Sequence, residues 1–207
     1  MKRLPLVLCV MVVSTSILAA AEDLRERVAY LKSNYKDVVT RVAQEASAMR
    51  LFGSGLPEVY SNFEENKGLA YYSFTGTLPY VFDPLRQRDS VRAGALWVAV
   101  AKPVAQIFWK LGGSIQQVDG VKIQIRTSST DSRMPLTRPG GNEVITYFFT
   151  TAELRRFFAG EIADADLFSR SQITFNGSNM KVDFTRDAAE IATLAQNITL
   201  FRERYAQ

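Results

Sequence analysis

Apolar side chains recur every three or four positions between residues 22 and 52, and this period predicts one long amphipathic helix. The repeating positions are Leu24, Val28, Leu31, Tyr35, Val38 and Val42. Such a stripe packs either on a second helix, as in a coiled-coil dimer, or on the protein's own sheet. The six residues are therefore a candidate interaction surface. Because the repeat is short, we expect the stripe to pack on the protein's own sheet, and a second helix is the alternative.

Aromatic and β-branched residues mark the expected strands. Residues 68–82 are rich in tyrosine and phenylalanine around Thr75-Gly76-Thr77, which predicts two strands joined by a turn. Residues 118–125 and 143–150 predict one strand each. The turn residues Asn176-Gly177-Ser178-Asn179 between two strand-like runs predict a hairpin over 171–184.

The most apolar stretch after the first residues spans 93–111. Pro103 predicts either a kinked helix or a helix that begins at this proline after an extended segment. Basic side chains recur near the helical period and predict a cationic stripe: Arg88, Arg92, Lys102 and Lys110. We expect this rod in the core of the domain, and a membrane surface or a partner groove is the alternative.

Together these elements predict an α+β protein with a mixed or antiparallel sheet packed by helices. Thr150 and Glu153 predict a capped helix after the fourth strand, and 187–204 predicts a final amphipathic helix. We divide the chain into a leader over 1–21, the long amphipathic helix over 22–52 and a single α+β domain over 53–207.

Residues 1–21 have the three parts of a secretory signal peptide. Lys2-Arg3 precedes a short apolar run, and Ala19-Ala20-Ala21 fits the specificity of signal peptidase for small residues. We expect cleavage and export, with the periplasm as the favoured compartment. An uncleaved signal anchor is the alternative.

The chain contains no histidine, and its one cysteine, Cys9, lies in the leader. The mature chain therefore lacks the residues for disulfides, Cys/His zinc sites and Cys–His or Ser-His-Asp catalysis. We find no specific catalytic motif, and we expect neither an enzyme nor a cofactor or metal. The net charge of +4 is too weak to indicate nucleic-acid binding.

Residues 126–142 show no apolar period and are long for a connection within a compact domain. Arg126, Arg133 and Arg138 lie in this loop among serine and threonine. Guanidinium and hydroxyl donors in one loop predict binding of an anion or of an acidic protein surface.

These features favour an exported, noncatalytic binding or assembly factor that contacts an envelope or secreted protein. Self-association through the N-terminal helix is one form of this hypothesis. An alternative is a carrier of apolar ligands or lipids, with the aromatic strands and residues 93–111 as pocket walls. A carboxylate- or serine-based hydrolase ranks below both, because no imidazole or thiol is present to activate a nucleophile.

Overall fold

The computed structural model describes residues 22–49, 51–52, 59–129 and 141–205. The predicted leader, Arg133 and Arg138 lie outside the described residues. The described chain is an α+β fold in which helices pack on a six-stranded mixed sheet, with two helices preceding the sheet. The predicted fold class is confirmed.

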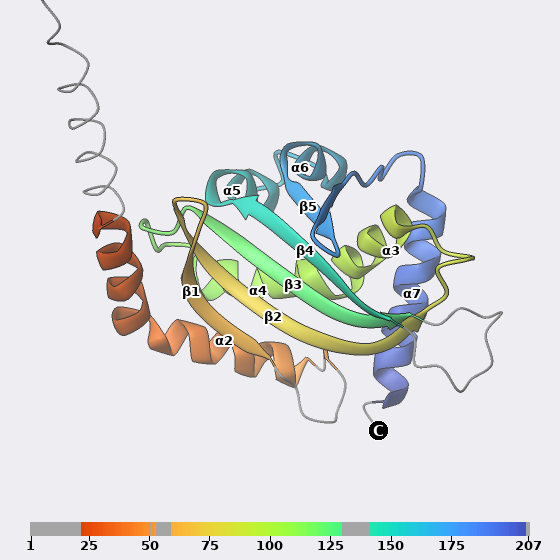
Figure 1. The fold of residues 1–207 in the computed structure, drawn as a ribbon, viewed down its shortest axis with the longest axis horizontal. Helices are drawn as coiled ribbons and strands as arrows, with labels where there is room; N and C mark the ends of the chain where they lie inside the picture. Colours follow the sequence, from red (N-terminus) through yellow and green to blue (C-terminus); the bar gives the residue numbers. More distant parts are fainter. Residues whose placement is uncertain (1–21, 50, 53–58, 130–140, 206–207) are drawn as a thin grey trace, which may run out of the picture.

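In chain order the elements are α1 (22–34), α2 (Lys36–Ala48), β1 (Tyr60–Asn66), β2 (Leu69–Phe82), α3 (Asp89–Leu96), the π-helical turn η1 (Trp97–Ala101), α4 (Lys102–Gly112), β3 (Gly120–Ser129), β4 (Asn142–Thr150), α5 (Thr151–Phe158), α6 (Asp164–Arg170), β5 (Gln172–Phe175), β6 (Ser178–Met180) and α7 (Ala188–Tyr205). The strands lie in the sheet in this same order. Neighbours are antiparallel except β2 and β3, which run parallel. Parallel neighbours need a crossover, and α3, η1 and α4 provide it behind the sheet (Figure 1).

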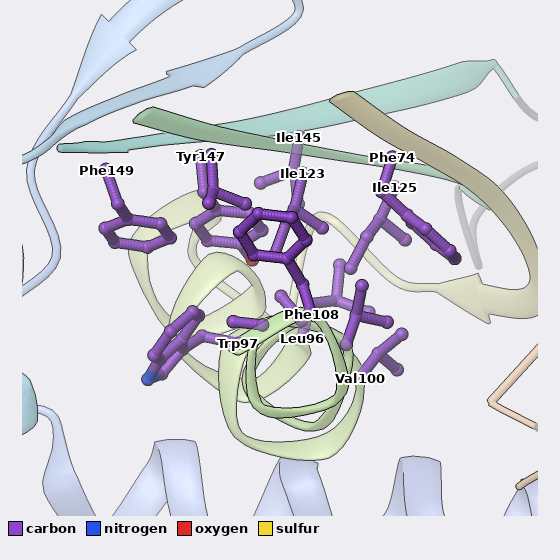
Figure 2. Close-up of a cluster of buried hydrophobic side chains, with 14 of the residues drawn as sticks. Phe74, Leu96, Trp97, Val100, Phe108, Ile123, Ile125, Ile145, Tyr147 and Phe149 are labelled. Carbon is purple, nitrogen blue, oxygen red and sulfur yellow. The ribbon is translucent and has the colours of Figure 1, made fainter. Parts of the chain in front are cut away.

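The residue pattern of β3 explains why the helices cover one face of the sheet. Val121, Ile123 and Ile125 are buried, whereas the polar residues between them are not. Successive side chains of a strand point to opposite faces, so one face of β3 is apolar and the other is polar. Figure 2 shows Ile123 and Ile125 facing Trp97 and Phe108 of the central helix.

Aromatic residues of β2 and β4 pack directly against this helix. The rings of Tyr72 and Phe108 stack with 4.1 Å between their centroids, and those of Trp97 and Phe149 lie 4.9 Å apart. Each of these rings is almost fully buried. The space between the aromatic strands and residues 93–111 is therefore filled by side chains that contribute to the core.

The central helix runs from Asp89 to Gly112. Of the two predicted alternatives, the helix that continues through Pro103 is therefore the one observed, and the extended segment before Pro103 is wrong. The wide turn η1 lies immediately before Pro103, where a proline disturbs the regular hydrogen bonding of a helix. This helix is long and apolar enough to cross a membrane by length and composition alone. However, 78% of its apolar window is buried inside the fold, which identifies it as the core helix of this domain.

The predicted cationic stripe on this helix is also wrong. Arg92 is buried and forms ion pairs with Asp89 and Glu143. Lys102 pairs with Asp164 of α6 at 3.0 Å. The helical period does not reveal the partners Glu143 and Asp164, which neighbouring elements supply.

The predicted single helix over 22–52 is two helices, because the chain bends at Tyr35. Leu24, Val28, Leu31 and Val42 are buried in the same core as the sheet. Two further members of the stripe, Tyr35 and Val38, are partly buried against that core. The protein's own domain therefore covers the stripe that the sequence left open to a second helix.

The first two strands meet at a different turn from the predicted one. Lys67 and Gly68 have positive φ values of 51° and 78° and form a two-residue hairpin turn. Gly76 lies inside the continuous strand β2, where a Cβ atom would be 2.3 Å from the ring of Phe52. The glycine thus permits close approach of a ring, and the predicted turn at this position is wrong.

Candidate functional site

A cleft of about 860 Å³ lies between α6, the β5–β6 hairpin and the segment 181–187 that leads to α7. Its lining residues are Ala165, Phe168, Ser169, Ser171, Gln172, Ile173, Asn179, Met180, Lys181, Val182, Asp183, Phe184, Thr185 and Arg186. This volume lies within the range that proteins use for ligand sites. The cleft is intermediate between an enclosed cavity and an open surface, so an occupant that extends beyond it is sterically allowed.

The floor of the cleft is apolar and belongs to the core. Phe168 and Phe184 meet edge to face with ring centroids 4.7 Å apart. Phe168 also contacts Trp97 at 5.3 Å, which connects the floor to the central helix. Ile173 is buried, and Met180 lies partly buried against the same cluster. A floor fixed in this way is preformed and offers an apolar surface to an occupant.

The rim of the cleft is polar. Gln172 donates a hydrogen bond from its side-chain amide to Asn179 Oδ1 at 2.9 Å. Ser169 on α6 and Lys181 beyond β6 are both exposed. Among the described residues Lys181 forms no ion pair, so its ammonium group is accessible to an acidic partner.

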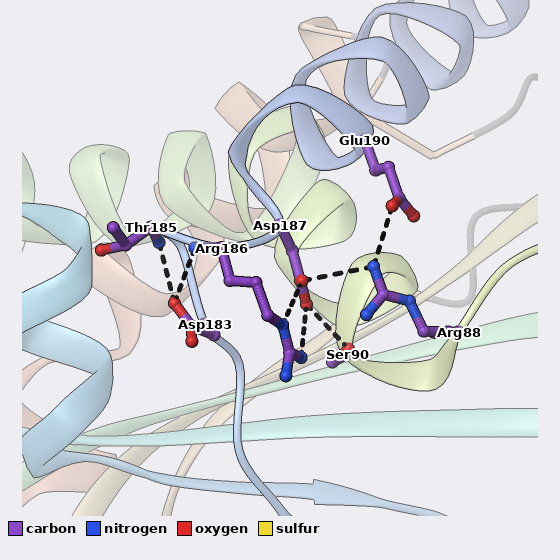
Figure 3. A network of polar contacts seen from close by, with 7 residues as sticks. All are labelled: Arg88, Ser90, Asp183, Thr185, Arg186, Asp187 and Glu190. Carbon is purple, nitrogen blue, oxygen red and sulfur yellow. Dashed lines mark hydrogen bonds and ion pairs between the residues drawn. The ribbon is translucent and has the colours of Figure 1, made fainter.

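A polar network holds the wall formed by residues 183–187 (Figure 3). Asp183 Oδ1 accepts the backbone N–H groups of Thr185 and Arg186 at 3.0 and 2.9 Å, which fixes the turn before α7. Arg186 in turn donates from Nε to Asp187 at 2.7 Å. Asp183 and Arg186 therefore stabilise the shape of the wall.

Asp187 is the centre of this network. Its buried carboxylate accepts hydrogen bonds from Arg186 and from Ser90 Oγ, the latter at 3.2 Å, and pairs with Arg88 at 3.2 Å. The hydrogen bonds from Arg186 are the main cause that lowers the pKa of Asp187 to about 2, with Ser90 and Arg88 adding to the effect. The wall is consequently tied to α3 by an ionised group at neutral pH.

The cleft borders β6, which is an edge strand of the sheet in the described part of the chain. Asn176 and Gly177 have φ values of 48° and 82°, which fits a two-residue hairpin turn between β5 and β6. In such a hairpin the pairs Phe175–Ser178 and Ile173–Met180 exchange main-chain hydrogen bonds. Asn179 lies between the two bonded positions, so its N–H and C=O groups point away from β5.

Of the predicted arginine site, Arg126 is described by the structure, and it does not line this cleft. Arg126 is exposed on the uncovered face of β3, where it lies opposite Thr77 and Val144 in the register. Arg133 and Arg138 lie outside the described residues, so the predicted arginine site stays a prediction. The sequence did indicate the Asn176-Gly177 turn, but it gave no signal that α6 stands opposite the hairpin across an open space.

A buried ion pair lies elsewhere and has a structural role. Arg92 and Glu143 join α3 to β4, and the guanidinium group of Arg92 lies 4.8 Å from the ring centre of Phe175. Glu143 Oε2 and Thr127 Oγ1 are buried there without a partner. In the part of the chain that the structure describes, no three His, Cys, Asp or Glu residues are placed to hold a metal ion.

Comparison with known proteins gives no relative from which a function follows. No protein-family model matches the chain, and no curated protein or solved structure shows a significant match.

Proposed function

We propose that the protein is an exported, noncatalytic binding factor whose cleft between α6 and residues 181–187 receives a segment of a partner protein. The observation that carries the proposal is the combination of an apolar floor, a polar rim and incomplete enclosure in one cleft of about 860 Å³. Proteins bind ligands in concave sites of this size that combine an apolar lining with a few polar groups.

The chemistry of the rim supports binding without catalysis. The charged residues that line the cleft are Lys181, Asp183 and Arg186. Asp183 is engaged by two backbone N–H groups, and Arg186 is paired with Asp187. Among the described residues, Lys181 is then the one charged residue of the lining that does not stabilise the wall. A lone ammonium group lacks the acid–base partner that hydrolysis needs.

The openness of the cleft supports a polypeptide occupant over a small apolar one. A carrier encloses its ligand, because exposed apolar surface on the bound ligand costs free energy. Here the aromatic strands and the central helix pack on each other, and the cleft is only partly enclosed. The leader predicted over 1–21 supports a partner in the cell envelope or outside the cell.

The proposal is tested by photo-crosslinking in the native host. A photoreactive residue replaces Ala165, which is exposed and lines the cleft, or Ala152, which is exposed on α5 and does not. We expect a discrete polypeptide adduct from position 165 alone. Identical adducts from both positions contradict the proposal, and a lipid adduct from position 165 favours the carrier instead.

A further inference from the structure

We infer that the partner segment binds as an extended strand that pairs with β6 and becomes the seventh strand of the sheet. The inference rests on the proposed function of the cleft and adds the conformation and the chemical character of the occupant. Its basis is a sheet edge that has no neighbouring strand among the described residues and lies directly beside an apolar cleft.

The main-chain groups of the edge are the first part of the argument. β6 pairs with β5 on one side, and Asn179 directs its N–H and C=O groups to the opposite side. An incoming strand exchanges two hydrogen bonds with this residue, as in other cases of strand addition. A helical occupant satisfies its own main chain internally and leaves these two groups to water.

The direction of the side chains is the second part. Met180 lies opposite Ile173 on the covered face of the sheet, where the floor of the cleft is, whereas Asn179 lies opposite Thr174 on the uncovered face. An added strand continues the same alternation. Every second side chain of the partner therefore enters the cleft and contacts Phe168 and Phe184, which favours apolar residues at these positions.

The charge of the rim is the third part. Lys181 follows Met180 directly beyond the end of β6, is exposed and lies at the rim of the cleft. Because Lys181 has no ion pair among the described residues, the partner's side chains at this rim are expected to include aspartate or glutamate. The structure thus assigns an occupant in which apolar residues alternate with polar and acidic ones.

A short edge strand followed by lysine also resembles the edges that proteins protect from unwanted pairing. The cleft distinguishes this edge from a merely protected one. A protected edge offers a partner only main-chain hydrogen bonds, each of which contributes little net free energy in water. Here the same partner also buries alternate side chains on Phe168 and Phe184, which supplies the apolar contact that affinity requires.

The test uses short random peptides displayed on phage and selected against the purified protein. A selected peptide is synthesised with a fluorophore, and its dissociation constant is measured by anisotropy. Single N-methyl groups are then placed along its backbone, since each removes one N–H donor without changing the side chain. We expect a loss of about tenfold at the one backbone position whose N–H donates to the C=O group of Asn179, and small losses at the neighbouring positions.

Two protein variants complete the test. Ala165→Trp fills the cleft and is expected to abolish peptide binding, whereas the matched Ala152→Trp leaves it unchanged. Lys181→Glu is expected to weaken the binding of an acidic peptide. When the acidic residues of that peptide are changed to lysine, the peptide is expected to bind the Lys181→Glu variant better than the wild type.

The outcomes separate the two proposals. If Ala165→Trp abolishes binding but no single N-methyl position weakens it by about tenfold, the cleft is a binding site and strand addition is wrong. If no selected peptide depends on the cleft, both proposals fail. If native mass spectrometry shows a dimer of the free protein that Ala165→Trp dissociates, a second copy is the occupant and the inferred partner is overturned.

Discussion

Arg202 of α7 donates a hydrogen bond to the carbonyl oxygen of Ala99 at 2.6 Å, four residues before Pro103. In a regular α-helix the carbonyl oxygen of Ala99 accepts the N–H of residue 103. Residue 103 is proline, which has no N–H to donate. The guanidinium group also donates to the carbonyl oxygen of Met49 at 3.1 Å. Burial lowers the pKa of Arg202. One side chain thus connects α7, the central helix and the end of α2.

The Arg202–Ala99 bond is expected to compensate for the proline. Arg202→Ala should destabilise the fold by about 1–3 kcal/mol, the cost of leaving a buried carbonyl group without a partner. In a Pro103→Ala background the backbone regains an N–H, so the same change should cost less. Urea unfolding followed by fluorescence of Trp97 and Trp109 measures both costs. Equal costs in the two backgrounds contradict the compensation.

The N-terminal helices are expected to stabilise the domain rather than to hold a partner. Leu31 is fully buried, so Leu31→Ala should cost about 2–5 kcal/mol of folding free energy. Lys32→Ala changes the adjacent exposed position and should have little effect. Urea unfolding and native mass spectrometry of both variants provide the measurement. Unchanged stability together with loss of a dimer would show that the stripe contacts a partner.

The ion pair between Arg92 and Glu143 is expected to be costly to break but replaceable as a whole. Glu143→Leu alone leaves Arg92 buried with only Asp89 as a partner, and we expect a loss of about 3–5 kcal/mol. The double variant Arg92→Met with Glu143→Leu removes both charges and should be more stable than Glu143→Leu. A double variant whose loss equals the sum of the two single losses would contradict strong coupling of the pair.

The stability of the fold is expected to depend on pH through Asp187, which holds the wall of the cleft. Its pKa of about 2 in the folded protein lies below the ordinary value of 3.8, so the ionised carboxylate stabilises the fold. This contribution is complete above pH 3.8 and is lost as the pH falls through about 2. The stability gap between the wild type and Asp187→Asn, measured by urea unfolding, should therefore close between these two values.

A second variant checks the cause of this pH dependence. Ser90→Ala removes one hydrogen-bond donor to Asp187 but keeps the carboxylate. The stability gap between the wild type and Ser90→Ala should be smaller than the gap for Asp187→Asn. It should close over the same pH range. A gap that stays constant with pH in both variants would show that Asp187 does not stabilise the wall by its charge.

Local sequence signals predicted several elements correctly. Thr150 and Glu153 form the expected capping box at the start of α5, and the Asn176-Gly177 turn joins β5 to β6 as predicted. In these cases the responsible groups are close in the sequence, so local chemistry is sufficient. The final helix and the strands β3 and β4 follow from hydrophobic periodicity in the same way.

The errors arise where distant residues decide the local structure. Gly76 resembles a turn glycine, but the close ring of Phe52 requires a residue without a Cβ atom at this position. Arg92 resembles a surface cation, but Glu143, which is far away in the sequence, draws it into the core. The cleft was missed for the same reason, because α6 and residues 181–187 meet through tertiary packing and share no motif.

The central claim is that the cleft between α6 and residues 181–187 binds a partner protein. The most direct test is the dissociation constant of the partner crosslinked from position 165, measured with the Ala165→Trp and Ala152→Trp variants at equal melting temperature. We predict that Ala165→Trp weakens binding by about tenfold or more, whereas Ala152→Trp binds like the wild type. Equal affinity of the two variants for this partner would contradict the claim.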